Sequence, residues 1–271
     1  SEGDVKVSNP LTTTEPFIRR SILPSLLGRV EHNFAQGNRD VRLFEIATSF
    51  RKAAKGEPPH EETHLAGVIT GRLEPPHWSR QDESITIWDF KALLEIAARI
   101  SYSGAAQVTV EQDVLPGFEE GRGFAVTDAE GLRVGYGGLV SSSEINAPVW
   151  AGDIWGFEIT LPKDPERLLP AMHVPLPIFP AIERDLALVV PGGTTAADVE
   201  SVIRGCGESL LESLEIFDLY LDTEDGSGFR SLAFRLRFRA MERTLKDKEV
   251  DKSIGLIIRK LREELNVEPR K

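Results

Sequence analysis

The sequence has a single cysteine, Cys206, among its 271 residues, so it cannot form an internal disulfide. Cys206 falls in an apolar helical pattern, which favours a packed side chain over a nucleophile. The chain contains no run of about 18 apolar residues, and no charged segment followed by an apolar one and a cleavage site opens it. These absences, together with the lack of disulfides, predict a cytoplasmic protein without membrane contact.

Positive charge is also scarce, because the net charge is −11. A protein that coats nucleic acid without sequence preference depends on summed positive charge, so this function is excluded. Residues 178–271 contain 15 basic and 18 acidic residues, so most of the acidic excess lies earlier in the chain. Any contact with RNA must therefore be local. The chain begins Ser-Glu-Gly without methionine, and we expect it to be a fragment of a longer polypeptide.

The length and the 41% hydrophobic content predict two domains. In the first, residues 1–162, a helix is expected at 20–35 and another at 88–100. Strands are expected at 41–50 and 64–71, joined by a polar loop, and at 107–111, 122–127, 132–140 and 154–160. This pattern is typical of an α+β domain with an antiparallel sheet. The first helix carries an apolar stripe of Leu23, Leu26, Leu27, Val30 and Phe34, which either a partner or the domain's own core can bury.

Six prolines lie between residues 162 and 180, so we place an extended linker at 163–177. The second domain, 178–271, begins with a strand at 184–190 and a helix capped by Thr195 and Asp198. Strands follow at 212–221 and 230–239. A second helix opens with Thr244 and Asp247 in the same spacing, and a short strand is expected at 266–269. The order βαββαβ predicts a ferredoxin-like fold.

The strand at 230–239 has two different faces. Its even positions, including Phe234 and Phe238, are apolar and should face the core. Its odd positions include Arg235, Arg237 and Arg239, which form a cationic row. Guanidinium groups pair with phosphate and stack on bases, so this row suits RNA, although a merely solvated face has the same pattern.

Three other residues join this row as candidates for RNA binding. Tyr220 offers a ring on which a base can stack, and Asp218 offers an acceptor on the neighbouring strand. Arg184 is either a further RNA contact or half of a structural ion pair.

One catalytic motif has to be weighed, His60-Glu61-x-x-His64. On a helix, two histidines in this spacing bind zinc and the glutamate activates water, so a zinc metallopeptidase is an alternative function. Pro58 and Pro59 precede the motif, strand-like residues follow it, and no third ligand stands out downstream. A solvated loop is the competing interpretation, and we predict no metal site.

The segments FPAIERDLALVV, LLESLEIFDLY, SLAFRLRF and ERTLKDKEV, in this order, resemble the ferredoxin-fold anticodon-binding domain of the beta subunit of bacterial phenylalanyl-tRNA synthetase. Upstream, NPLTTTEPFIRRSILPSLLGRV, GNRDVRLFEIATSF and LAGVITG resemble the class II synthetase-like core of the same subunit. The segments PGFEEGRGFAV and VSSSEI depart from the family pattern.

This resemblance implies a noncatalytic subunit that assembles with an alpha subunit, two of each, and binds the anticodon stem-loop of tRNA(Phe). The helix at 22–34 would contribute to the alpha interface through its apolar stripe. The assembled enzyme would use ATP and Mg²⁺, whereas this fragment would hold no cofactor. Arg42 and Glu45 resemble the class II ATP-binding strand, but the second ATP-binding arginine motif is missing. The fragment is therefore expected neither to activate phenylalanine nor to cleave peptides.

Overall fold

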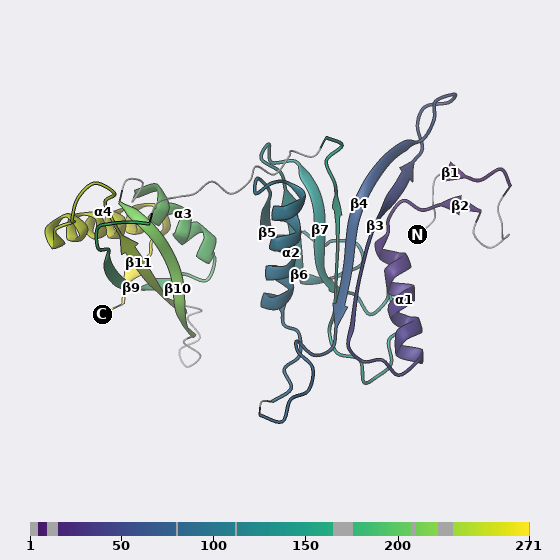
Figure 1. The fold of residues 1–271 in the computed structure, drawn as a ribbon, viewed down its shortest axis with the longest axis horizontal. Coiled ribbons are helices and arrows are strands. Elements are labelled where there is room, and N and C mark those ends of the chain that lie inside the picture. Colours follow the sequence, from purple (N-terminus) through teal and green to yellow (C-terminus); the bar gives the residue numbers. More distant parts are fainter. Residues whose placement is uncertain are drawn as a thin grey trace. The chain divides into compact units, whose positions relative to one another are not determined.

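The computed structural model describes residues 5–9, 16–79, 81–111, 113–164, 176–206, 210–221 and 230–270. The chain divides into two compact units, Ser1–Pro170 and Ala171–Lys271, each with its own sheet (Figure 1). Most of the expected linker, residues 165–175, lies outside the described residues, so the boundaries at 162, 163–177 and 178 stay a prediction. Among the described residues, no helix combines the length and apolar composition needed to cross a membrane.

The first unit is built on a sheet of six antiparallel strands. In spatial order these are β3 (Val41–Arg51), β4 (His60–Thr70), β8 (Ile154–Thr160), β7 (Arg133–Val140), β6 (Phe118–Thr127) and β5 (Gln107–Glu111). Two short strands, β1 (Val5–Lys6) and β2 (Phe17–Ile18), pair with each other separately. The antiparallel α+β architecture expected for this part of the chain is thus confirmed.

Helices α1 (Leu23–Ala35) and α2 (Ile87–Ser101) cover opposite faces of this sheet (Figure 1). Successive side chains of a strand point to opposite faces, so Ile154 packs in the cluster with α1 while Trp155 packs in the cluster with α2. Phe90 of α2 stacks on Trp155 with ring centroids 5.2 Å apart. We call the two surfaces of the sheet the α1 face and the α2 face.

A glycine on the α2 face makes room for an aromatic ring. A Cβ atom placed on Gly67 would lie 2.5 Å from Cε1 of Phe157, much closer than van der Waals contact allows. The ring of Phe157 can therefore pack directly on β4 at this point because position 67 has no side chain.

The second unit has the order β9 (Ile182–Val190), α3 (Ala196–Cys206), β10 (Leu211–Leu221), β11 (Arg230–Phe238), α4 (Asp247–Leu265) and β12 (Glu268–Pro269). Its antiparallel sheet runs β10-β11-β9-β12, which confirms the ferredoxin-like βαββαβ fold. Phe234 and Phe238 are fully buried with Val199, Ile203 and Ile257 of the helices, as the alternation predicts.

The two helix starts of this unit compare differently with their expected caps. Thr195 and Asp198 form the expected capping box, since each backbone N–H bonds the other residue's side chain, at 2.7 and 3.1 Å. The second helix begins at Asp247, and the backbone N–H of Lys246 donates to Glu249 at 3.0 Å. The expected Thr244 and Asp247 cap is wrong, because the helix begins further along the chain than the pattern indicates.

The segment with the zinc-like motif is a strand. β4 begins at His60, so the connection between β3 and β4 is only residues 52–59. Four residues along a strand separate His60 from His64 by about 13 Å, whereas a helix would bring them onto one turn. Within the described part of the chain, no three His, Cys, Asp or Glu side chains gather as a metal site requires. The metallopeptidase geometry and the solvated-loop interpretation are both wrong here.

Candidate nucleic-acid interface

In the described part of the second unit, both helices pack against the same face of the sheet. We call the opposite face the outer face. β11 carries Arg235 and Arg237 on it, and the register sets Asp185 and Glu183 of β9 directly opposite them. Glu215 of β10 lies opposite Arg235 on the other side. Cationic and acidic side chains therefore alternate across three strands of the outer face.

Arg235 is held by a forked ion pair and rests on an aromatic ring. Its Nε and Nη2 atoms each donate to one oxygen of Asp185 at 2.8 Å, and its guanidinium carbon lies 4.8 Å from the ring centroid of Phe217. The side-chain hydrogen bonds raise the pKa of Arg235 and lower the pKa of Asp185. Asp185 takes up the Nε and Nη2 edge of the guanidinium and compensates its charge, so Arg235 offers its flat face for stacking rather than an uncompensated fork for phosphate.

Arg237 and Arg239 share one carboxylate. Their Nε atoms lie 2.9 Å from the two oxygens of Glu212, one each. Arg239 also donates to the backbone carbonyl of Phe179, and only 10% of its side chain is exposed. Arg237 remains partly accessible on the outer face, whereas Arg239 fastens the end of β11 and is withdrawn from the candidate interface.

Arg184 lies on the helix-covered face, not on the outer face. It sits in β9 at the same parity as the core residues Leu186 and Leu188, and its Nη2 atom donates to Asp247 at 2.6 Å. Asp251 is a second partner at 3.4 Å. The structure thus favours the ion-pair alternative for Arg184, which lies on the other side of the sheet from the remaining candidates.

Tyr220 lies on the outer face and is 51% exposed. Its ring packs against Arg270, whose guanidinium carbon is 4.6 Å from the ring centroid. Asp218 is exposed on the same face, opposite Ala233. Ala233 in turn pairs with Ala187, so two small side chains form the floor between these groups.

Two residues of the outer face escaped sequence reasoning, Phe217 and Arg270. The register of β10 shifts between Ile216 and Asp218, so Phe217 is an extra residue in a β-bulge and falls outside simple alternation. The adjacent apolar pair Ile216 and Phe217 is the one sign of this in the sequence. Arg270 follows a two-residue strand, which is too short to show any pattern.

The apolar stripe expected to meet the alpha subunit is buried inside the first unit. Its five residues are all at most 7% exposed and pack with β3, β4 and β8; they are Leu23, Leu26, Leu27, Val30 and Phe34. A single stripe can serve one partner, and here the domain's own core takes it. Direct contact of these side chains with another subunit is therefore wrong, while the exposed residues of α1, such as Arg29 and His32, stay available.

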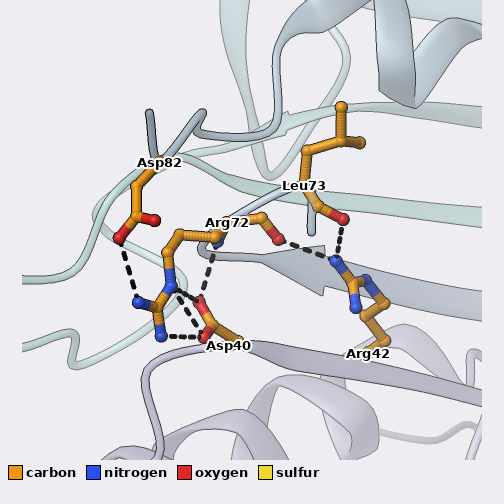
Figure 2. A network of polar contacts seen from close by, with 5 residues as sticks. All are labelled: Asp40, Arg42, Arg72, Leu73 and Asp82. Carbon is orange, nitrogen blue, oxygen red and sulfur yellow. Dashed lines mark hydrogen bonds and ion pairs between the residues drawn. The ribbon is translucent and has the colours of Figure 1, made fainter. Parts of the chain in front are cut away.

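Figure 2 shows where the side chain of Arg42 goes. Its Nη2 atom donates to the backbone carbonyls of Arg72 and Leu73 at 2.7 and 2.5 Å. Arg72 in turn donates to Asp40 at 2.6 Å and to Asp82 at 3.1 Å. This network ties the segment after β4 to the start of β3, so the arginine that resembles an ATP ligand has a structural role.

Comparison with known proteins gives matches over both units. A family model for the phenylalanyl tRNA synthetase beta chain CLM domain matches residues 1–161, and one for the ferredoxin-fold anticodon binding domain matches residues 177–270.

Three similar proteins are phenylalanine-tRNA ligase beta subunits. The one from Synechococcus sp. (strain JA-3-3Ab) is 33% identical over 255 residues, covering 91% of this chain and 30% of the relative. Those from Listeria monocytogenes serovar 1/2a and Anaeromyxobacter dehalogenans are 29% and 33% identical, each covering 98% of this chain and 33% of the relative. The chain thus spans about a third of the length of these relatives. Since the beta chain match covers more than half of the residues, the protein belongs to the phenylalanyl-tRNA synthetase beta chain family.

Proposed function

We propose that this chain works as a noncatalytic part of a phenylalanyl-tRNA synthetase beta subunit in the cytoplasm, and that the outer face of its second unit binds the anticodon stem-loop of tRNA(Phe). One observation carries the proposal. Two guanidinium-aromatic pairs, Arg235 with Phe217 and Arg270 with Tyr220, are exposed on one face of an antiparallel sheet. The anticodon-binding domain match over residues 177–270 supports it.

The chemistry of the outer face favours bases over phosphates. Asp185, Glu183 and Glu212 surround the arginines and repel a phosphate, but they do not hinder stacking on a ring or on a guanidinium plane. An anticodon loop with splayed bases can stack on the two pairs. Asp218 can accept from an exocyclic amino group of a base. Binding should accordingly depend on salt only weakly.

We further propose that catalysis belongs to an alpha subunit, which uses ATP and Mg²⁺ in an assembly of two alpha and two beta subunits. Two observations support a noncatalytic role for the first unit. The guanidinium of Arg42 is bound to backbone carbonyls, and Glu45 accepts from Arg19 at 2.7 Å. Both side chains are thus engaged in contacts within the first unit. The alpha subunit then meets the exposed side of α1, around Arg29 and His32, rather than the buried stripe.

The test is the affinity of the assembled enzyme for tRNA(Phe), measured by filter binding. A variant with Arg235→Ala and Arg237→Ala should bind about tenfold more weakly or worse, because stacking is worth about 1–3 kcal/mol per base. Arg259→Ala, on the exposed side of α4, is the matched control and should bind normally. Unchanged affinity in the double variant would mean that the arginine row is only a solvated face and does not contact tRNA.

A further inference from the structure

The first unit contains a small polar pocket on the α1 face of its sheet. Its volume is about 230 Å³, which suits an ion or a small metabolite rather than a larger cofactor. The polar side chains that line it come from the segment before α1 and from strands β3, β4, β7 and β8, and include Arg20, Arg51, His64, Arg133, Tyr136 and Thr160.

The carboxylate at the base of this pocket, Glu158, is already satisfied. It is 3% exposed, and its Oε2 atom accepts from Ser21 Oγ at 2.6 Å and from the backbone N–H groups of Ile22 and Leu23 at 3.0 Å. The positive end of the α1 dipole lies at the same point. The negative charge of Glu158 is thus compensated locally, and it does not set the charge of the pocket.

Guanidinium groups dominate the rim. Arg51 and Arg133 are each about half exposed, and the carboxylates paired with them there are Glu62, at 3.4 Å, and Glu111. The pair of Arg51 with Glu62 is partly exposed and contributes at most about 1 kcal/mol, so an incoming anion can compete with it, whereas Glu111 is only 10% exposed. A guanidinium has five N–H donors, and a single carboxylate leaves several of these for a second acceptor.

Besides the arginines of the rim, the buried side chain of His64 indicates a ligand in this pocket. It is 4% exposed, and its Nδ1 atom lies 3.2 Å from Glu158 Oε1. Burial lowers the pKa of His64 and so favours the neutral ring. Nδ1 also lies 3.4 Å from Thr160 Oγ1, and we assign the ring proton to Nδ1, facing the carboxylate of Glu158, which makes Nε2 an acceptor. Among the described residues Nε2 has no partner within hydrogen-bond distance, and the carboxylate oxygen Oε2 of Glu62, itself an acceptor, lies 3.6 Å away. Buried polar atoms are normally hydrogen-bonded, so the Nε2 acceptor of His64 calls for a donor from a ligand.

We propose that this pocket binds a small oxyanion that also carries an O–H group, as hydrogen phosphate and hydroxy acids do. The anionic oxygens accept from Arg51 and Arg133, with Arg20 beside them, and the O–H group supplies the donor that His64 lacks. This site is separate from the outer face and does not depend on tRNA binding.

Tryptophan fluorescence can follow the unfolding of the unit that contains the pocket. All four tryptophans of the chain lie in the first unit, at positions 78, 88, 150 and 155. Thermal unfolding of the full 271-residue chain, read by this signal, should shift upward by about 3 °C in saturating sodium phosphate relative to sodium chloride of equal ionic strength. Lactate and acetate form two further arms, which separate hydroxy acids from carboxylates without a hydroxyl group.

Two variants decide the assignment. Arg51→Met with Arg133→Met keeps the aliphatic stems and should weaken phosphate binding at least tenfold by calorimetry, whereas Arg122→Met, a surface arginine outside the pocket, should leave it unchanged. If the double variant does not fold, the single Arg51→Lys variant, which loses the planar fork, should still weaken binding. The proposal fails if phosphate and lactate both give no saturable shift, if acetate binds as tightly as lactate, or if the folded variants bind as tightly as the parent chain.

Discussion

Arg270 and Tyr220 meet above the outer face although they belong to its two opposite edges. Tyr220 lies on β10, and Arg270 directly follows β12, at the far end of the strand order. Their contact, 4.6 Å from guanidinium carbon to ring centroid, spans the alanines of the two central strands. The pair links both edges of the sheet, and Tyr220 remains half exposed to a ligand.

Tyr220→Ala should therefore weaken tRNA(Phe) binding by the assembled enzyme. The lost base stacking is worth about 1–3 kcal/mol, which corresponds to about 5- to 150-fold in affinity. Tyr220→Phe keeps the ring and should bind within about twofold of the parent enzyme. Equal affinity for all three proteins in fluorescence anisotropy would contradict a stacking role.

Gly67→Ala should destabilise the first unit by about 1–3 kcal/mol, because the new methyl group would overlap the ring of Phe157. Gly28→Ala is the matched control in the same unit. It lies in α1 with nothing within 4 Å of a Cβ, so the same change should stabilise by about 0.5–1 kcal/mol through helix propensity. Urea unfolding followed by tryptophan fluorescence gives both values, and equal signs would contradict this account.

Glu249 should make the second unit sensitive to acid. The guanidinium of Arg243 and the backbone N–H of Lys246 lower the pKa of Glu249 to about 2. Since the folded pKa lies below the unfolded one, the stabilisation is complete above about pH 4.5 and disappears as the pH falls through about 2. Carboxyl chemical shifts give the pKa directly.

The matched control for this titration is Glu263, an exposed residue of the same helix. Glu249→Gln should flatten the loss of stability between about pH 5 and pH 2, and Glu263→Gln should not. Circular dichroism serves as the readout, because the second unit has no tryptophan. An unchanged acid profile in Glu249→Gln would refute the assignment.

The isolated chain should show no catalysis. Mixed with ATP, phenylalanine and Mg²⁺ it should give no pyrophosphate exchange above that of a mock preparation, since the guanidinium of Arg42 is held by the backbone carbonyls of Arg72 and Leu73. Added zinc should produce no peptide hydrolysis, because His60 and His64 lie on a strand. Exchange that copurifies with the chain would overturn the noncatalytic proposal.

The sequence predicts burial best where a regular pattern of apolar residues has a single physical cause. Strict alternation around Phe234 and Phe238 follows from a strand with one buried face, and both residues are buried. The stripe on α1 likewise predicts a buried helix face. The stripe does not indicate whether a partner subunit or the domain's own core covers that face, because the same side chains suit both.

The remaining differences arise from local geometry that periodicity does not encode. β9 begins at Ile182, before the expected start at Arg184. Arg184 is therefore inside the strand rather than at its end, and the alternation of the strand decides which face of the sheet its side chain occupies. The β-bulge at Phe217 shifts the parity of β10 and adds a ring to the outer face. β4 extends back to His60 because its residues pair with β3 along their whole length.

The carboxylate of Glu158 also constrains the order in which the first unit can be completed. It accepts the backbone N–H of Ile22 from a strand 136 residues later in the chain. During synthesis, the start of α1 leaves the ribosome long before β8 exists, and until then its first N–H groups have only water as partners. Contacts of such long range make folding slow, so chaperones would meet this unit with its central strand still missing.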